Sequence, residues 1–254
     1  VPERAYPTFT ASEDGESFLS ISGQGEDSTL QSPSHGICKF DMRKTFENQW
    51  PADFSFSPVN GRLLVTMSSG QVFEVEVESH RIKTSRVFAS NALLAKYNKD
   101  GSRIAIARND GSVEIIDTLT GTSLRRVVGR NDRAISAAWS DRGQIAVGYL
   151  GGAILCFNEA EDAAPVSRQI GTDQISSLAF SPDGSVLATG SFDKTSRLLN
   201  SSNLEQIRVL TGHAGAVRQV CFVHDGQHLI TGGLDGQIKV WGTSGSQPIY
   251  ELAQ

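Results

Sequence analysis

Short apolar segments recur along the whole chain at a nearly constant interval, and turn-forming residues separate them. The first apolar segment of each repeat ends in an aromatic residue, and successive aromatic residues stand 41 to 47 positions apart: Phe9, Phe56, Tyr97, Trp139, Phe180 and Phe222. A turn sequence follows each of them, as at Asp100-Gly101 and Asp183-Gly184. Because Gly supplies the positive φ that a tight hairpin requires, each repeat is predicted to begin with a β-hairpin.

The rest of each repeat keeps the same order. In the last repeat an apolar segment over 229–231 is followed by a turn at Asp235-Gly236 and by an alternating segment over 238–241. Alternation of apolar and polar residues is typical of a strand with one buried face. A more polar fourth segment ends the unit. Four short antiparallel strands repeated every ~40–45 residues are the pattern of a β-propeller blade.

The repeats therefore predict an all-β chain, with one β-propeller domain of four-stranded antiparallel blades over residues 1–254. Each blade of a propeller buries its faces against its neighbours, so the ring is expected to fold as a whole. Six blades are visible, with the approximate bounds 5–50, 51–90, 91–132, 133–173, 174–215 and 216–254.

The last repeats resemble a WD repeat. The resemblance rests on the run from Leu210 to His213, on Thr231-Gly232-Gly233-Leu234-Asp235-Gly236 and on Val240-Trp241. It implies a hydrogen-bonded tetrad inside one blade, in which a carboxylate accepts from an imidazole and an indole fills the gap between blades. A structural role, and neither a catalytic nor a metal-binding one, is thus expected for His213. The four tetrad positions are His213, Asp235, Thr231 and Trp241.

The number of repeats differs from the usual ring of this family, which has seven blades. Six repeats are consistent with a closed six-blade ring, with a ring in which the seventh blade is supplied by a partner, or with a truncated chain. Completion by a partner would be strand addition at an exposed sheet edge.

The resemblance also indicates a docking face. The family binds partners mainly on the loops between the second and third strands of each blade, and the residue before the turn Asp projects there. In the last three blades that position holds Leu150, Phe192 and Leu234. Such an apolar patch is typical of a partner site, although these side chains could instead fold onto the rim or line the channel. Nearby positions on the same alignment are Trp50, Asn91, Asn109, Gln174 and Arg218.

The first blade contains an unusually long loop. In each blade, an aromatic residue ends the first strand and the Trp position of the repeat ends the third. These two positions are 31 residues apart in the first blade (Phe9 and Phe40) and 18 or 19 apart in the others. The extra residues form a polar stretch over 23–36. Loops that outgrow their scaffold often carry function, although a tolerated surface insertion explains the length equally well. The run from Ala5 to Pro7 and the run from Leu19 to Glu26 are similar to the opening of the exchange factor for the small GTPase of COPII coats. That resemblance implies a potassium ion and an active loop at Gly23, Gly25 and Glu26.

Composition narrows the function classes. The net charge of −5 argues against a nucleic-acid partner, and the sequence predicts no membrane span. Three cysteines without a paired spacing favour a reducing compartment, and the cytoplasm is therefore expected. Neither a nucleophile elbow, nor a phosphate loop, nor a zinc-protease motif occurs.

The sequence thus favours a non-catalytic interaction scaffold in a multiprotein complex, without cofactor or metal. The alternative is a nucleotide exchange factor for a small GTPase at the cytosolic face of the endoplasmic reticulum.

Overall fold

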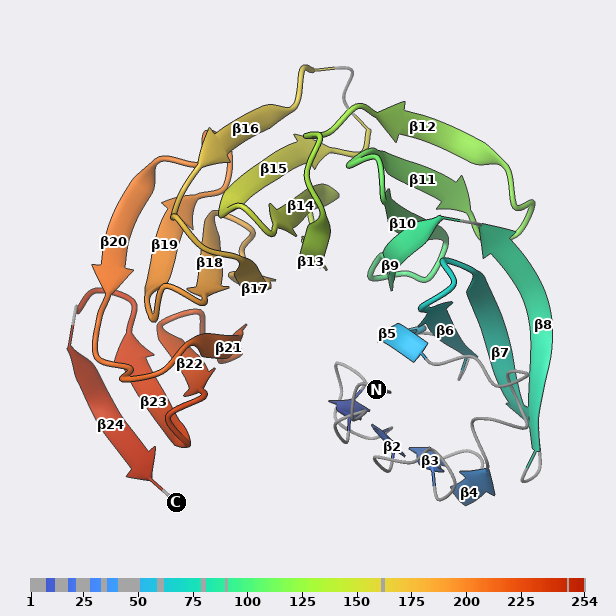
Figure 1. The fold of residues 1–254 in the computed structure, drawn as a ribbon, viewed down its shortest axis with the longest axis horizontal. Coiled ribbons are helices and arrows are strands. Elements are labelled where there is room, and N and C mark those ends of the chain that lie inside the picture. Colours follow the sequence, from blue (N-terminus) through green and yellow to red (C-terminus); the bar gives the residue numbers. More distant parts are fainter. Residues whose placement is uncertain are drawn as a thin grey trace, which may run out of the picture. The chain divides into compact units, whose positions relative to one another are not determined.

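The computed structural model describes residues 8–11, 18–21, 28–32, 36–40, 51–58, 62–78, 81–89, 91–160, 163–245 and 247–253. Within these ranges the regular elements are strands, and they form six four-stranded sheets in which each strand pairs with its neighbour along the chain (Figure 1). The prediction of an all-β propeller built from four-stranded blades is therefore confirmed. No helix in the same ranges has the length and apolar character that crossing a membrane requires.

The chain divides into two compact units: residues 1–106 with 116–124, and residues 107–115 with 125–254. Each unit is considered by itself. The first sheet contains β1 (Thr8–Ala11), β2 (Phe18–Ile21), β3 (Ser28–Ser32) and β4 (Gly36–Phe40). The second contains β5 (Pro51–Phe56), β6 (Arg62–Met67), β7 (Val72–Glu78) and β8 (Arg81–Ala89). The third contains β9 (Ala92–Tyr97), β10 (Arg103–Arg108), β11 (Val113–Asp117) and β12 (Ser123–Val127), and its residues are divided between the two units.

Three further sheets belong to the second unit. The fourth sheet contains β13 (Ala134–Trp139), β14 (Gln144–Tyr149), β15 (Ala153–Asn158) and β16 (Val166–Gln169). The fifth contains β17 (Ile175–Phe180), β18 (Val186–Ser191), β19 (Ser196–Asn200) and β20 (Gln206–Leu210). The sixth contains β21 (Val217–Phe222), β22 (His228–Gly233), β23 (Gln237–Gly242) and β24 (Pro248–Ala253).

In the first unit, an apolar cluster and a buried polar group join the second and third sheets. Leu64 and Val72 pack with Ala95, Ile104 and other buried residues of β9 to β11. The Tyr97 hydroxyl donates to the buried Glu74 carboxylate at 2.6 Å. Burial, together with this carboxylate, raises the pKa of Tyr97 far above its usual value.

In the second unit, neighbouring sheets bury their faces against each other. Residues of β14 and β15, including Ala146 and Ile154, pack with Leu178 and Leu187 of the fifth sheet. A second cluster joins Ala188, Leu198 and Leu210 of the fifth sheet to Val220, Leu229 and Trp241 of the sixth. The fifth sheet thus has a neighbour on each face, and its strands carry buried apolar residues on both sides.

Gly111 shows why the turns constrain the sequence. Its φ is +75°, and a Cβ there would lie 1.5 Å from the carbonyl oxygen of Arg130. The Tyr149 hydroxyl donates to the Gly111 carbonyl at 3.1 Å, which ties the turn between β10 and β11 to the fourth sheet. Only glycine satisfies both the positive φ and the close approach.

Candidate functional site

The three apolar positions predicted for the docking face occupy equivalent places in three consecutive sheets. Leu150, Phe192 and Leu234 each follow the second strand of their sheet. Their backbone N–H groups donate to the carbonyl oxygens of Arg133, Gln174 and Ala216, at 2.9, 3.1 and 2.8 Å respectively. In all three sheets a register shift follows the first residue of the inner strand. The same backbone geometry therefore presents all three side chains.

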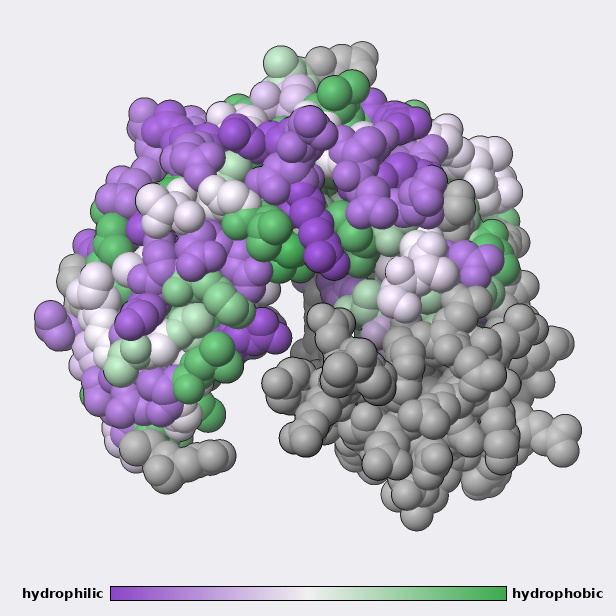
Figure 2. All heavy atoms as spheres, viewed as in Figure 1, coloured by the Kyte–Doolittle hydropathy of each residue, from purple (hydrophilic) through white to green (hydrophobic). Residues whose placement is uncertain are grey.

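Their surroundings differ. Leu150 is 45% exposed and Leu234 is 64% exposed, whereas Phe192 is partly buried. The Arg218 guanidinium lies over the Phe192 ring, with Cζ 5.5 Å from the ring centroid. The structure thus brings two predicted residues together in a cation–π contact. Where hydrophobic residues are visible on the surface of the second unit in Figure 2, they stand in small groups among hydrophilic ones.

The remaining predicted residues have varied positions. Asn109 is exposed in the turn after β10, and Gln174 is partly buried beside Phe192. Asn91 is exposed in the first unit and has a φ of +59°. Trp50 and the first-blade residues Gly23, Gly25 and Glu26 lie outside the described residues. The potassium-binding loop and the exchange-factor hypothesis therefore stay predictions.

A chain of hydrogen bonds joins the four tetrad residues. The Nδ1 atom of His213 lies 2.9 Å from Oδ2 of Asp235, and its Nε2 lies 2.7 Å from the Thr231 hydroxyl. The indole N–H of Trp241 donates to the same hydroxyl at 2.8 Å. An ionised carboxylate can only accept, so Nδ1 of His213 carries the proton that is donated to Asp235. In the tautomer with its proton on Nδ1, Nε2 accepts from the Thr231 hydroxyl, which in turn accepts from the indole N–H.

The Asp235 carboxylate is the charged end of this chain. Burial disfavours its charge, but the hydrogen bond from His213 and those from the N–H groups of Gln237 and Ala214 outweigh that effect and lower the pKa to about 2. The side chains of Asp235 and His213 are only 7% and 2% exposed. The arrangement anchors the turn between β22 and β23 to the loop before β21, and it uses both imidazole nitrogens internally.

The fifth sheet holds the equivalent turn with a different partner, which the sequence reasoning missed. Asp193 accepts from Nη1 of Arg197 at 2.8 Å. Gly171 stands where the sixth sheet has His213, and a Cβ there would lie 2.8 Å from the Asp193 carboxylate and 3.3 Å from Nη1 of Arg197. The loss of His together with a gain of Arg on the third strand was the available signal.

Two cysteine thiols, Cys156 and Cys221, have raised pKa values. Burial raises the pKa of Cys156 to about 12 and also raises that of Cys221. A thiol with a raised pKa is a weak nucleophile at neutral pH. Within the described part of the chain, no group of three His, Cys, Asp or Glu side chains has the geometry to hold a metal ion.

Comparison with known proteins agrees with the repeat pattern. A family model described as "WD domain, G-beta repeat" matches residues 204–242, and one described as "Domain of unknown function (DUF7165)" matches residues 50–199, which is more than half of the chain.

Three curated relatives illustrate the range of similarity. WD repeat-containing protein slp1 of Schizosaccharomyces pombe is 29% identical over 58% of this chain, and Protein HIR1 of Mycosarcoma maydis is 27% identical over 68%. The U3 snoRNP-associated protein-like EMB2271 of Arabidopsis thaliana is 38% identical over 25%. The chain spans only 30%, 18% and 13% of the lengths of these proteins.

Proposed function

Because this chain belongs to the WD-repeat β-propeller proteins and to the DUF7165 family, we propose that it is a non-catalytic scaffold that docks a partner protein on the turns carrying Leu150, Phe192 and Leu234. We call these three residues the docking face. The observation that carries the proposal is the exposure of Leu150 and Leu234, two large apolar side chains held at equivalent places on hydrogen-bonded turns.

Rigid presentation supports binding on physical grounds. A turn that is already ordered loses little conformational freedom when a partner docks, so more of the contact energy remains as affinity. The Phe192–Arg218 pair offers an aromatic ring and a guanidinium in one place, and both groups are enriched among residues that dominate interface energies. Asn109 and Gln174 supply a polar surrounding.

A multiprotein complex is the proposed setting. One relative is named as U3 snoRNP-associated, and this supports assembly with other macromolecules for the present chain. The cysteines Cys156 and Cys221 are free thiols, in agreement with a proposed reducing cytoplasmic location. The proposal requires neither a cofactor nor a metal.

The test is affinity capture from cytosol with the wild type, with Leu150→Asp and with Leu234→Asp. We expect a set of partners that both substitutions remove, because a carboxylate in a desolvated apolar contact is strongly unfavourable. The matched control is Leu119→Asp, since Leu119 is 82% exposed but lies in the turn after β11, at the other end of its strand.

Two results would contradict the docking face. Partners that survive both substitutions would show that binding occurs elsewhere, and partners lost equally with Leu119→Asp would indicate a general loss of solubility. Capture of a small GTPase that neither Leu150→Asp nor Leu234→Asp affects would instead favour the exchange-factor alternative.

A further inference from the structure

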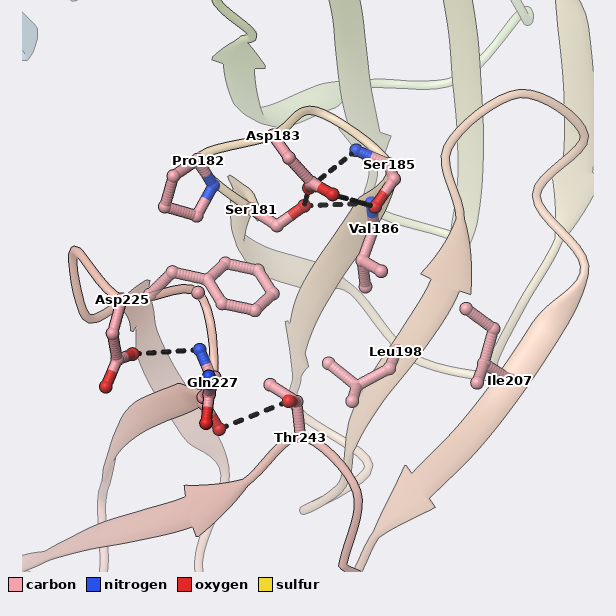
Figure 3. A pocket seen from close by; sticks show the side chains of 12 residues that line it. Ser181, Pro182, Asp183, Ser185, Val186, Leu198, Ile207, Asp225, Gln227 and Thr243 are labelled. Carbon is pink, nitrogen blue, oxygen red and sulfur yellow. Dashed lines mark hydrogen bonds between the residues drawn. The ribbon is translucent and has the colours of Figure 1, made fainter.

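A hollow of about 350 Å³ lies between the fifth and sixth sheets (Figure 3). It is at the beginning of β18, whereas the docking face follows the end of that strand. Two hairpin turns flank it: the turn at 181–185, between β17 and β18, and the turn at 223–227, between β21 and β22. Because β18 has six residues, the turn at Asp183 and the turn at Phe192 are about 20 Å apart. The hollow is therefore separate from the docking face.

The inside of the hollow is apolar. Leu198, Val186 and Phe222 line it, and Ile207 of β20 forms its outer wall with 51% of its surface exposed. Figure 3 shows Leu198, Val186 and Ile207 converging on one space from the fifth sheet. A volume near the lower limit of ligand pockets suits one large side chain. An aliphatic side chain placed there would contact apolar groups from both sheets.

The rim of the hollow is acidic. Asp183 accepts from the Ser181 hydroxyl at 2.6 Å and from the Ser185 N–H at 3.0 Å, and these bonds lower its pKa to about 2. Asp225 accepts from the Gln227 N–H at 2.8 Å. Among the described residues that line the hollow, two are Asp and none is Lys or Arg. Both carboxylates are held by their own turns, and Nδ1 of His228 also lies 2.6 Å from Oδ2 of Asp225.

A second, polar hollow of about 310 Å³ lies on the other side of the same turn. It shares Ser185 with the first hollow and is lined by Arg142 and Asn158 of the fourth sheet. The Arg142 side chain passes close to Gly184, 3.2 Å from where a Cβ would stand. A cation thus lies beside this turn on the side of the fourth sheet, and its charge also lowers the pKa of Asp183.

We infer that the first hollow binds an extended segment of a partner protein in which a large aliphatic side chain stands between a basic and an acidic residue. The aliphatic side chain fills the space beside Leu198 and Ile207. The basic residue lies against Asp183 and Asp225, and the acidic residue crosses the turn toward Arg142. With the docking face at the other end of β18, the chain carries two recognition sites of different chemistry.

The test begins with selection of a phage-displayed random peptide library on the full chain. We expect enriched peptides to share a basic, an aliphatic and an acidic residue in this order or its reverse. One enriched peptide, labelled with fluorescein, is then titrated in fluorescence anisotropy. Ile207→Lys should weaken binding at least about tenfold, since it adds a cation and removes an apolar wall. The matched control, Ile249→Lys, also changes an exposed Ile of an outer strand and should leave binding within about twofold.

Two substitutions of opposite charge at one position, Gln227, keep the inference testable if Ile207→Lys impairs folding. Gln227 lines the hollow and makes its turn contacts through backbone groups, which a side-chain substitution preserves. Gln227→Lys should weaken the peptide about threefold and Gln227→Glu should tighten it by a similar factor. An absence of enriched peptides, or a consensus without a basic residue, would overturn the inference. So would binding that is lost with Leu234→Asp but kept with Ile207→Lys, and that result would leave the proposed docking face intact.

Discussion

The fifth and sixth sheets hold the same turn with different side chains. In the sixth sheet, Asp235 accepts from His213, and the chain of hydrogen bonds continues from His213 to Thr231 and from Thr231 to Trp241. In the fifth sheet, Asp193 accepts from Arg197 of β19, and the histidine position is Gly171. Both arrangements keep a carboxylate at the turn after the second strand. The carboxylate is therefore the constant part, and its donor varies with the space available.

The fourth sheet extends this comparison. Its turn contains Gly151 where the other two sheets have Asp. Here the carboxylate belongs to the loop before β13, where Asp132 accepts from the Gly151 N–H at 2.9 Å. What all three turns share is a backbone hydrogen bond from the residue before this position to the loop that precedes the first strand of the sheet. We conclude that the tie to the loop is the structural requirement, because it fixes the residue that each turn presents at the docking face.

The largest difference in stability between the two sheets is expected when the side chain at the position of Trp241 is truncated. Trp241→Ala removes a side chain that is 1% exposed and leaves Thr231 without its indole donor, at a cost of about 3–5 kcal/mol in the free energy of unfolding. Leu199 is the register equivalent in the fifth sheet, and Leu199→Ala should cost less, about 2–3 kcal/mol. Urea unfolding followed by circular dichroism measures both. A cost near zero for Trp241→Ala would mean that the blade assignment is wrong there.

The second prediction concerns a variant in which an Arg replaces His213 as the hydrogen-bond donor to Asp235. His213→Gly leaves Asp235 and Thr231 without their partner and should cost about 2–3 kcal/mol. Lys239 is the register equivalent of Arg197 and pairs with Glu251 at 2.7 Å, so the double substitution His213→Gly with Lys239→Arg places an Arg where the fifth sheet has its donor.

We expect the double substitution to recover at least about half of that loss, as measured by urea unfolding. Lys239→Arg alone is the control, and it should not stabilise the protein while His213 fills the space. A double variant no more stable than His213→Gly would show that the two arrangements are not interchangeable.

The third prediction concerns pH. The pKa of Asp235 is about 2 in the folded chain against 3.8 for an unperturbed Asp, so its stabilising effect is complete above pH 4 and is lost as the pH falls toward 2. Asp235→Asn should remove about 1–2 kcal/mol of the stability difference between pH 4 and pH 2. Other carboxylates also titrate there, and the wild type is the reference. Parallel stability curves for the two proteins would contradict the assignment.

Much of the fold could be predicted, because strands and turns depend on local sequence. The aromatic residues and Asp-Gly turns located the repeat, and the WD resemblance named the four residues that the structure joins by hydrogen bonds. The Arg197–Asp193 pair was missed, because a charged residue on an alternating strand looks like an ordinary exposed position unless one notices Gly171 where the last repeat has His213. The stacking of Arg218 on Phe192 also escaped prediction, because it joins side chains of different sheets whose relative position no local pattern encodes.

The smallest effect on the free energy of unfolding is expected for the Arg197–Asp193 pair, which is more exposed than the His213–Asp235 pair of the sixth sheet. The side chains of Arg197 and Asp193 are 13% and 14% exposed, so Arg197→Gln should cost about 1 kcal/mol and lose part of that cost at high salt. Arg126→Gln is the matched control, because its pair with Asp110 is 55% exposed on both sides and should contribute close to nothing. Urea unfolding at low and high salt distinguishes the two. An equal and negligible cost for both would mean that Asp193 holds its turn through Thr195 alone, whose N–H and hydroxyl both donate to it.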